Sequence, residues 1–189
     1  MSGTDGGAAL ARVPTGIGGL DTILRGGFLA GGLYIVQGPP GTGKTTLANQ
    51  VCFNHVASGG RTLYVTLLAE YHARMLQHLG GMSFFDAAKI PDQVSYISAF
   101  RTLRQDGPRG LLDLLRREIV ARKVSILILD GFAAAQRGAG DAQGFDEFVH
   151  ELQGIAVATD CTVFLLTSMA GTRDTPEYTI VELSDQLLG

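Results

Sequence analysis

The sequence VQGPPGTGKTTLANQ, residues 36–50, joins an apolar run to a helical pattern and carries the spacing G-x-x-x-x-G-K-S/T over residues 38–45. The apolar run before it, LYIVQ (33–37), favours a strand, and the pattern from Lys44 to Ser58 favours a helix. A glycine-rich loop between a strand and a helix is the context in which this spacing binds phosphate. The stretch therefore predicts a nucleotide-phosphate loop.

The residue types of this loop suit that role. Glycines allow backbone conformations in which successive N–H groups face an anion, and the following helix adds its positive N-terminal end. We expect Lys44 to reach the β- and γ-phosphates and Thr45 to offer its hydroxyl to Mg²⁺. Thr46 is also compatible with a helix residue that faces the core. The expected nucleotide contacts are Gly38, Pro39, Pro40, Gly41, Thr42, Gly43, Lys44, Thr45 and Thr46.

Two acidic residues follow other apolar runs. Asp130 ends VSILILD (124–130), so we expect it at the carboxyl edge of a sheet, where it would orient Mg²⁺ together with Thr45. Its alternative is a turn residue before Gly131. Glu70 follows LYVTLLA and is the candidate that, with Lys44, would act in catalysis by orienting the attacking water. Its alternative is an exposed residue at a helix start.

Strand-like and helical patterns alternate along the chain, which predicts an α/β fold with a mostly parallel sheet and helices on both faces. We expect strands at 33–37, 61–68, 93–99, 124–130 and 162–168, and helices at 44–58, 72–79, 111–123 and 145–159. We expect a mobile tail over 1–12 and one domain over 13–189. The ending EYTIVELSDQLLG resembles another strand, and we expect the domain to continue beyond Gly189.

Composition narrows the classes of function. The chain has 189 residues, of which 46% are hydrophobic and 17% charged, and its formal net charge is −3, so no overall basic field favours nucleic acid. The two cysteines, Cys52 and Cys161, read as buried free thiols. Without a cationic leader or a long apolar run, the sequence predicts a cytoplasmic protein with no membrane contact. No N-K-x-D sequence occurs, which favours ATP over GTP.

The motifs TGIGGLD, GGF, GPPGTGKTT, LYVTLLAE, ILILD and LLTS, in this order, resemble the KaiC-like ATPases of the RecA/RadA P-loop superfamily from about Val13 to the C-terminus. The resemblance implies a RecA-like core in which the strand at 162–168 lies between the P-loop strand and the strand of Asp130. It also implies ATP, Mg²⁺ and a homo-oligomeric ring or filament with nucleotide at subunit interfaces.

The chain departs from that family pattern in two places. Typical members have two adjacent glutamates directly after the strand here occupied by YVTLL, whereas this chain has Leu68-Ala69-Glu70. Typical members also continue past the position of Gly189, where a basic finger reaches the neighbouring subunit. Both departures lead us to expect ATP binding with weak turnover.

Three functions follow as hypotheses. The first is a slowly hydrolysing KaiC-like ATPase that couples nucleotide state to oligomer assembly or to a signalling partner. The second is a RadA-like DNA recombination or repair ATPase, which is disfavoured because Arg101, Arg104 and Arg109 read as a solvated surface around a loop. The third is an ATP-binding interaction module without hydrolysis. Thr167 and Ser168 would either sense the γ-phosphate or bond local backbone groups.

Overall fold

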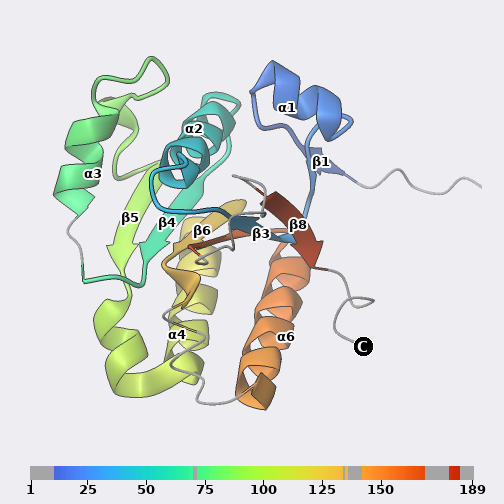
Figure 1. The fold of residues 1–189 in the computed structure, drawn as a ribbon, viewed down its shortest axis with the longest axis vertical. Helices are drawn as coiled ribbons and strands as arrows, with labels where there is room; N and C mark the ends of the chain where they lie inside the picture. The colour runs from blue at the N-terminus through green and yellow to red at the C-terminus, as the bar shows by residue number, and fades with distance from the viewer. Residues whose placement is uncertain (1–10, 70–71, 134, 136–141, 169–178, 184–189) are drawn as a thin grey trace, which may run out of the picture.

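The computed structural model describes residues 11–69, 72–133, 135, 142–168 and 179–183. Its centre is a six-stranded sheet in the order β5-β4-β6-β7-β3-β8 (Figure 1). Five of these strands run parallel, and β8 pairs antiparallel with β3 at the edge. The strands are β3 Leu33–Gln37, β4 Thr62–Thr66, β5 Val94–Ser98, β6 Ile126–Asp130, β7 Thr162–Thr167 and β8 Thr179–Leu183.

Strand β7 lies between β3 and β6, as the family resemblance implies. Gln37 at the end of β3 pairs with Thr167 at the end of β7, and Leu166 pairs with Asp130 at the end of β6. The carboxyl ends of three strands therefore meet along one edge of the sheet. This is the edge where open α/β folds bind their ligands.

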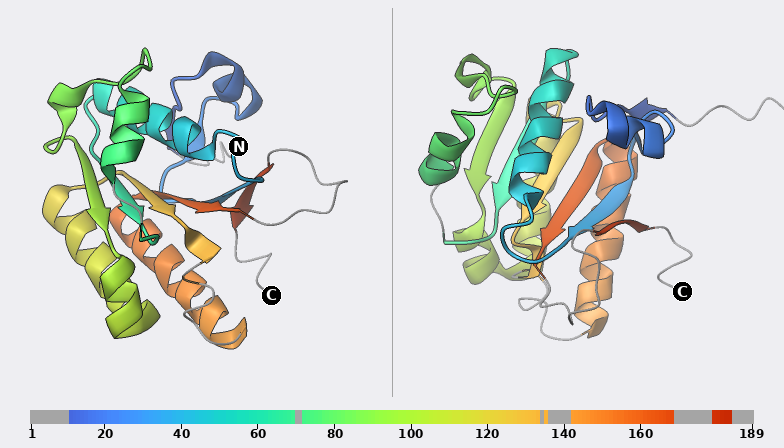
Figure 2. Two further views of the ribbon diagram at one scale, coloured as in Figure 1. Left: turned by 60° about the vertical axis from the view of Figure 1, so that its left-hand side comes forward. Right: turned by 45° about the horizontal axis from the view of Figure 1, so that its top comes forward.

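Helices cover both faces of the sheet, which confirms the predicted architecture (Figures 1 and 2). Helices α2 (Lys44–Ala57) and α3 (His72–Leu79) lie on one side, and α4 (Phe100–Arg122) and α6 (Ala142–Thr159) on the other. A short helix α1 (Gly18–Ile23) and a turn of 3₁₀ helix, Ala87–Lys89, are also present, and residues 132, 133 and 135 are helical as well.

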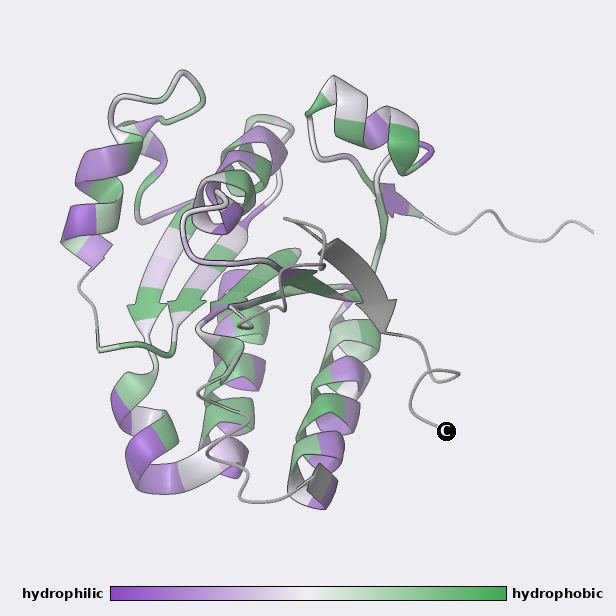
Figure 3. Cartoon of the chain, viewed as in Figure 1, coloured by the Kyte–Doolittle hydropathy of each residue, from purple (hydrophilic) through white to green (hydrophobic). Residues whose placement is uncertain are grey.

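Alternation along the strands divides the core into two layers. Successive strand residues point to opposite faces of a sheet. In β6, Leu127 and Leu129 pack in the layer under α4 and α6, whereas Ile126 and Ile128 pack in the layer under α2. Helices α4 and α6 show alternating hydrophilic and hydrophobic bands in Figure 3, as expected for helices with one buried side.

A two-stranded antiparallel sheet precedes the P-loop strand. It pairs β1 (Arg12–Val13) with β2 (Phe28–Leu29). The Arg12 guanidinium donates to the carbonyls of Leu24 and Gly27, at 3.0 and 2.7 Å. Arg12, which the sequence predicts to belong to a mobile tail over 1–12, is therefore part of a strand.

Helix α4 begins earlier than the sequence predicts. It starts at Phe100 rather than near residue 111, and Gly107 interrupts it with a φ of 69°. Glycine adopts this conformation without the Cβ penalty of other residues, and the next residue, Pro108, is well suited to the first turn of a new helical segment. The predicted loop is therefore a kink between two helical segments, and Arg101 and Arg104 are exposed helix residues.

Across the described residues, the helices are too short or too polar to span a lipid bilayer.

Candidate functional site

The glycine-rich loop connects the end of β3 to the start of α2, as the sequence predicts. Gly41 and Gly43 both have a φ of 85°, a left-handed conformation that favours glycine. Gly43 is also the N-cap of α2, and no side chain caps that end. The first turn of α2 thus presents backbone donors and the positive end of the helix dipole toward the loop.

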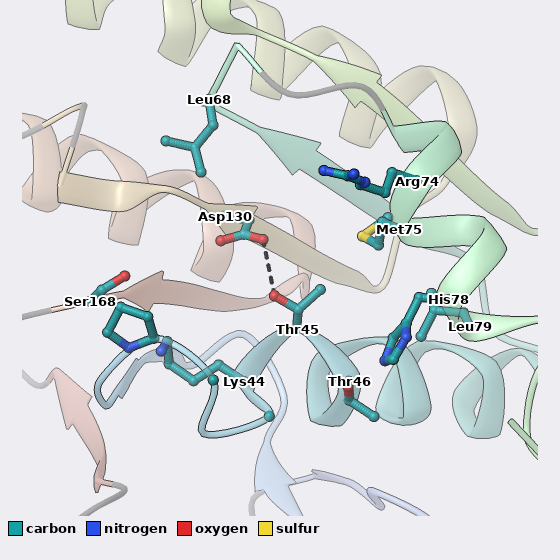
Figure 4. A pocket seen from close by; sticks show the side chains of 13 residues that line it. Lys44, Thr45, Thr46, Leu68, Arg74, Met75, His78, Leu79, Asp130 and Ser168 are labelled. Atoms are coloured by element: carbon teal, nitrogen blue, oxygen red, sulfur yellow. Dashed lines mark hydrogen bonds between the residues drawn. The ribbon is translucent and has the colours of Figure 1, made fainter.

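A cavity of about 860 Å³ opens over this loop. Figure 4 shows that its walls come from the loop, from α3 and from the ends of β4, β6 and β7. Its lining residues are Pro40, Gly41, Gly43, Lys44, Thr45, Thr46, Leu68, Arg74, Met75, His78, Leu79, Asp130 and Ser168. The volume lies within the range of about 300–1,000 Å³ typical of small-molecule sites.

Lys44 folds back over the loop. Its ammonium donates to the carbonyl of Gly38 at 2.6 Å and to that of Pro39 at 2.8 Å. Burial lowers the pKa of Lys44, and the negative charge of Asp130 opposes this shift. The ammonium is therefore a donor whose present partners are neutral carbonyls, and an anion would be a stronger partner for it.

Asp130 is the last residue of β6 and faces the start of α2. Its Oδ2 accepts from the Thr45 hydroxyl at 3.5 Å and from the Tyr64 hydroxyl at 2.5 Å. Burial raises the pKa of Asp130, while the hydrogen bonds from Tyr64, Gly131 and Thr45 lower it again, as does the charge of Lys44. The carboxylate thus stands beside a hydroxyl and a cation, an arrangement that can hold a hydrated divalent cation.

The residue that lines the cavity just after β4 is apolar, whereas an acidic residue is expected near this strand end. Leu68 lines the cavity close to Asp130 (Figure 4), and its side chain packs against Gly131. Glu70, the candidate water-orienting residue, lies outside the described residues. The strand end that faces the cavity is therefore apolar at Leu68.

The structure excludes one of the two interpretations of Thr46, that of a helix residue facing the core. Thr46 lines the cavity beside Thr45 and is half-buried, instead of facing the core. Ser168 also lines the cavity, whereas Thr167 is buried at the end of β7, where its carbonyl accepts from the Gly38 amide at 3.4 Å. Of the two candidate sensors, the structure brings Ser168 to the cavity.

Three side chains near the site were missed from the sequence. Arg74 and His78 line the cavity from α3, and their spacing of four residues places them on one helix face. That spacing was visible in the sequence, but the face that turns to the cavity was not. Tyr64 stands in the apolar run 61–68, and nothing in the sequence sets it apart from its neighbours there.

Both cysteines and two of the histidines stay apart from the cavity. Cys52 and Cys161 are buried free thiols, and burial raises the pKa of each to about 12. His55 lies 2.7 Å from the Ser125 hydroxyl, and His150 is exposed. Within the described residues, no group of three or more histidines, cysteines and carboxylates is arranged to hold a metal.

Comparison with curated proteins gives relatives from two groups. The chain is 30% identical over 139 residues to the DNA repair and recombination protein RadB of Pyrococcus furiosus, covering 74% of this chain and 58% of RadB. It is 26% identical over 182 residues to the circadian clock oscillator protein KaiC of Acaryochloris marina, covering 94% of this chain and 34% of KaiC. The chain therefore spans less than two thirds of the length of either relative.

Among solved structures, a KaiC-like protein from Pyrococcus horikoshii is similar with a TM-score of 0.71 and 22% identity. The match covers 87% of this chain and 74% of that protein, which supports the RecA-like fold. The family model described as ATPase: KaiC matches residues 13–187. Since this match spans nearly the whole chain, the protein belongs to the KaiC family of P-loop ATPases.

Proposed function

We propose that this chain binds ATP with Mg²⁺ in the cavity over the P-loop and hydrolyses it slowly. The observation that carries the proposal is that a single cavity is lined by Lys44 and Thr45 from α2 and by Asp130 from β6. A cation and a hydroxyl at a helix N-terminus bind phosphate and magnesium, and a carboxylate opposite them helps to hold the metal.

In this proposal residues 38–46 surround the phosphates, and the backbone amides of residues 41–46 donate to them, since Pro39 and Pro40 have no N–H. Lys44 exchanges its contacts with the Gly38 and Pro39 carbonyls for the β- and γ-phosphates, because an anionic acceptor binds an ammonium more strongly than a neutral one does. Ser168 is positioned at the cavity to hydrogen-bond a terminal phosphate.

The donor set at Thr45 and Asp130 fits magnesium, which prefers hard oxygen ligands and keeps several of its waters. Thr45 would bind the ion through its hydroxyl, and Asp130 would accept hydrogen bonds from its waters. Bound there, Mg²⁺ would neutralise phosphate charge. Among the described residues that line the cavity, the one imidazole is that of His78 on α3, and His72 lines a smaller adjoining pocket with Thr45 and Asp130.

We attribute the slow rate of hydrolysis to the apolar side chain of Leu68. An apolar side chain cannot orient or deprotonate water, and Leu68 stands beside Asp130 where β4 ends. Glu70 is the residue we propose for that role. Glu70→Gln should then slow phosphate release while leaving ATP affinity unchanged, and equal rates would return Glu70 to a helix-start role.

The decisive experiment measures ATP affinity and phosphate release on the same preparation. Tight Mg²⁺-dependent binding with slow release supports the proposal. Tight binding with no release above background identifies an interaction module without hydrolysis. Absence of ATP binding contradicts the proposal altogether.

We further propose that nucleotide state controls self-assembly into a ring or filament or contact with a signalling partner, which is what the resemblance to KaiC-like ATPases implies. Light scattering with ATP, with ADP and without nucleotide tests it. A mass that stays that of one chain under all three conditions would exclude nucleotide-controlled self-assembly.

A role in DNA repair or recombination is the second candidate, favoured by the RadB relative and by a RadA relative in Synechocystis, 28% identical over 169 residues. Arg101, Arg104 and Arg109 on α4 are exposed and available for phosphate contacts. In that case DNA would stimulate phosphate release with a steep dependence on salt. Unchanged release in the presence of DNA would leave the first proposal.

A further inference from the structure

The carboxylate of Asp130 is held by a residue from the neighbouring strand. Tyr64 lies in the middle of β4 and pairs with Ile128 of β6, so Asp130, two residues further on, is its diagonal neighbour on the same face. The Tyr64 side chain is 1% exposed, and its hydroxyl donates to Asp130 Oδ2 at 2.5 Å. A buried ring thus delivers one donor to one oxygen of this carboxylate.

The two hydroxyls on Oδ2 are not equivalent. The Thr45 hydroxyl stands at 3.5 Å, at the long limit of a hydrogen bond, whereas the Tyr64 hydroxyl is 1.0 Å closer, at 2.5 Å. Among the described side chains, none donates to the other oxygen, Oδ1. Tyr64 therefore fixes the carboxylate through Oδ2, and Thr45 is only weakly engaged by it.

The Tyr64 ring is itself fixed. It packs against Tyr96 of β5 with ring centroids 5.5 Å apart, and the two residues are Cα partners. The Tyr96 hydroxyl donates to Asn49 Oδ1 at 2.7 Å, and the Asn49 amide donates to the Thr45 carbonyl at 2.8 Å. Tyrosines from neighbouring strands thus support both halves of the site: Tyr64 contacts the carboxylate directly, and Tyr96 is linked to the first turn of α2 through Asn49.

From this geometry we propose that Tyr64 is a positioning residue, which orients the Asp130 carboxylate for the hydrated Mg²⁺ of bound ATP. The inference rests on the proposed function, since it concerns the same site. Partners that orient a metal-binding group from behind commonly matter about 10- to 100-fold for metal affinity. The competing interpretation is that Asp130 merely satisfies a buried tyrosine hydroxyl.

The test uses Tyr64→Phe, which removes the oxygen and keeps the ring. Affinity for a fluorescent ATP analogue is measured across a Mg²⁺ titration and again in EDTA, and Mn²⁺ binding in the presence of ATP is measured by electron paramagnetic resonance. We expect the Mg²⁺ concentration at half-saturation and the Mn²⁺ dissociation constant to rise about tenfold, with affinity in EDTA unchanged. Unchanged metal requirements would overturn the inference.

The matched control is Tyr34→Phe. Tyr34 is also buried, and its hydroxyl accepts from the Leu29 amide at 2.8 Å, away from the cavity. This variant loses a buried hydroxyl in the same way, so it should lower the melting temperature and leave the metal requirement unchanged. An equal rise in both variants would mean that Tyr64 acts through general stability, which contradicts the inference.

A double-mutant cycle with Asp130→Asn tests whether Tyr64 acts through Asp130. If it does, adding Tyr64→Phe to Asp130→Asn should change the Mn²⁺ affinity by less than about twofold. If the two substitutions instead weaken Mn²⁺ affinity by factors that multiply in the double variant, Tyr64 acts independently of Asp130, which would overturn the inference. Failure of the unmodified protein to bind ATP would instead reject the proposed function. If the unmodified protein binds ATP and Tyr64→Phe has the same metal requirement, only the role of Tyr64 is rejected.

Discussion

The Thr45 hydroxyl and the Asp130 carboxylate face each other at 3.5 Å although 85 residues separate them in the sequence. Thr45 arrives on the first turn of α2, and Asp130 arrives as the last residue of β6. The parallel sheet brings them together because β3 and β6 end at the same edge, and β3 leads directly to α2. Their approach is thus a consequence of strand order.

Replacing Asp130 with Asn should separate metal binding from nucleotide binding. The change keeps the shape of the side chain and removes its charge, so we expect the Mg²⁺ requirement for ATP binding to rise by about tenfold or more. Affinity for ATP in EDTA should not fall. Asp113→Asn, at an exposed position of α4, is the control and should change neither quantity.

Replacing Lys44 with Ala should weaken ATP binding strongly. Its ammonium contacts only the Gly38 and Pro39 carbonyls among its described hydrogen-bond partners, so its loss should leave the melting temperature nearly unchanged. Loss of a charge-assisted contact to phosphate, about 1.5–3 kcal/mol, predicts at least a tenfold weaker dissociation constant by calorimetry. Lys89→Ala, outside the cavity, should bind as the unmodified protein does. Equal affinity in both variants would contradict the proposed phosphate site.

The strand ends that line the cavity could be predicted because local signals agree there. An apolar run that ends in aspartate predicts a buried strand and its carboxyl end, which places Asp130, and the glycine-rich loop between a strand and a helix places Lys44 and Thr45 on the first turn of α2. The strand order could not follow from these signals, since periodicity says nothing about which strands pair. It came from the family resemblance and is confirmed by the pairing of β7 with both β3 and β6.

The missed features depend on tertiary contacts. A tyrosine in an apolar strand reads as core, and only the pairing of β4 with β6 brings the Tyr64 hydroxyl to Asp130. The Gly107-Pro108 pair reads as a break between elements, yet α4 resumes after it because Leu103 and Leu111, on either side, are both buried in the same layer. Local propensity was overruled there by packing.

Stability should fall in mild acid because of His55. Its ring is half-buried and lies 2.7 Å from the Ser125 hydroxyl, and burial lowers its pKa from the ordinary value of 6.5. A histidine whose folded-state pKa is lowered disfavours the protonated form, so the unfolded chain binds more protons and the free energy of unfolding decreases as pH falls below about 6.5. His72 shifts in the same direction, so it should contribute to the same decrease.

Denaturant titrations at several pH values check this prediction. His55→Gln should reduce the difference in unfolding free energy between neutral and mildly acidic pH, since the titrating ring is gone. His150→Gln, at an exposed position, should retain the full difference. The same slope in all three proteins would show that burial of His55 does not govern the acid response.

Leu68→Glu should increase phosphate release. The substitution places a carboxylate at the end of β4 beside Asp130, where the structure has an apolar side chain. A correctly positioned acid–base group contributes about 10²- to 10⁴-fold, and an unoptimised one should give the lower part of that range. Phosphate release at saturating ATP is the measurement. Leu68→Gln has the same size without the acid–base group and should not accelerate release, so equal rates in the two variants would show that a missing carboxylate at residue 68 does not limit turnover.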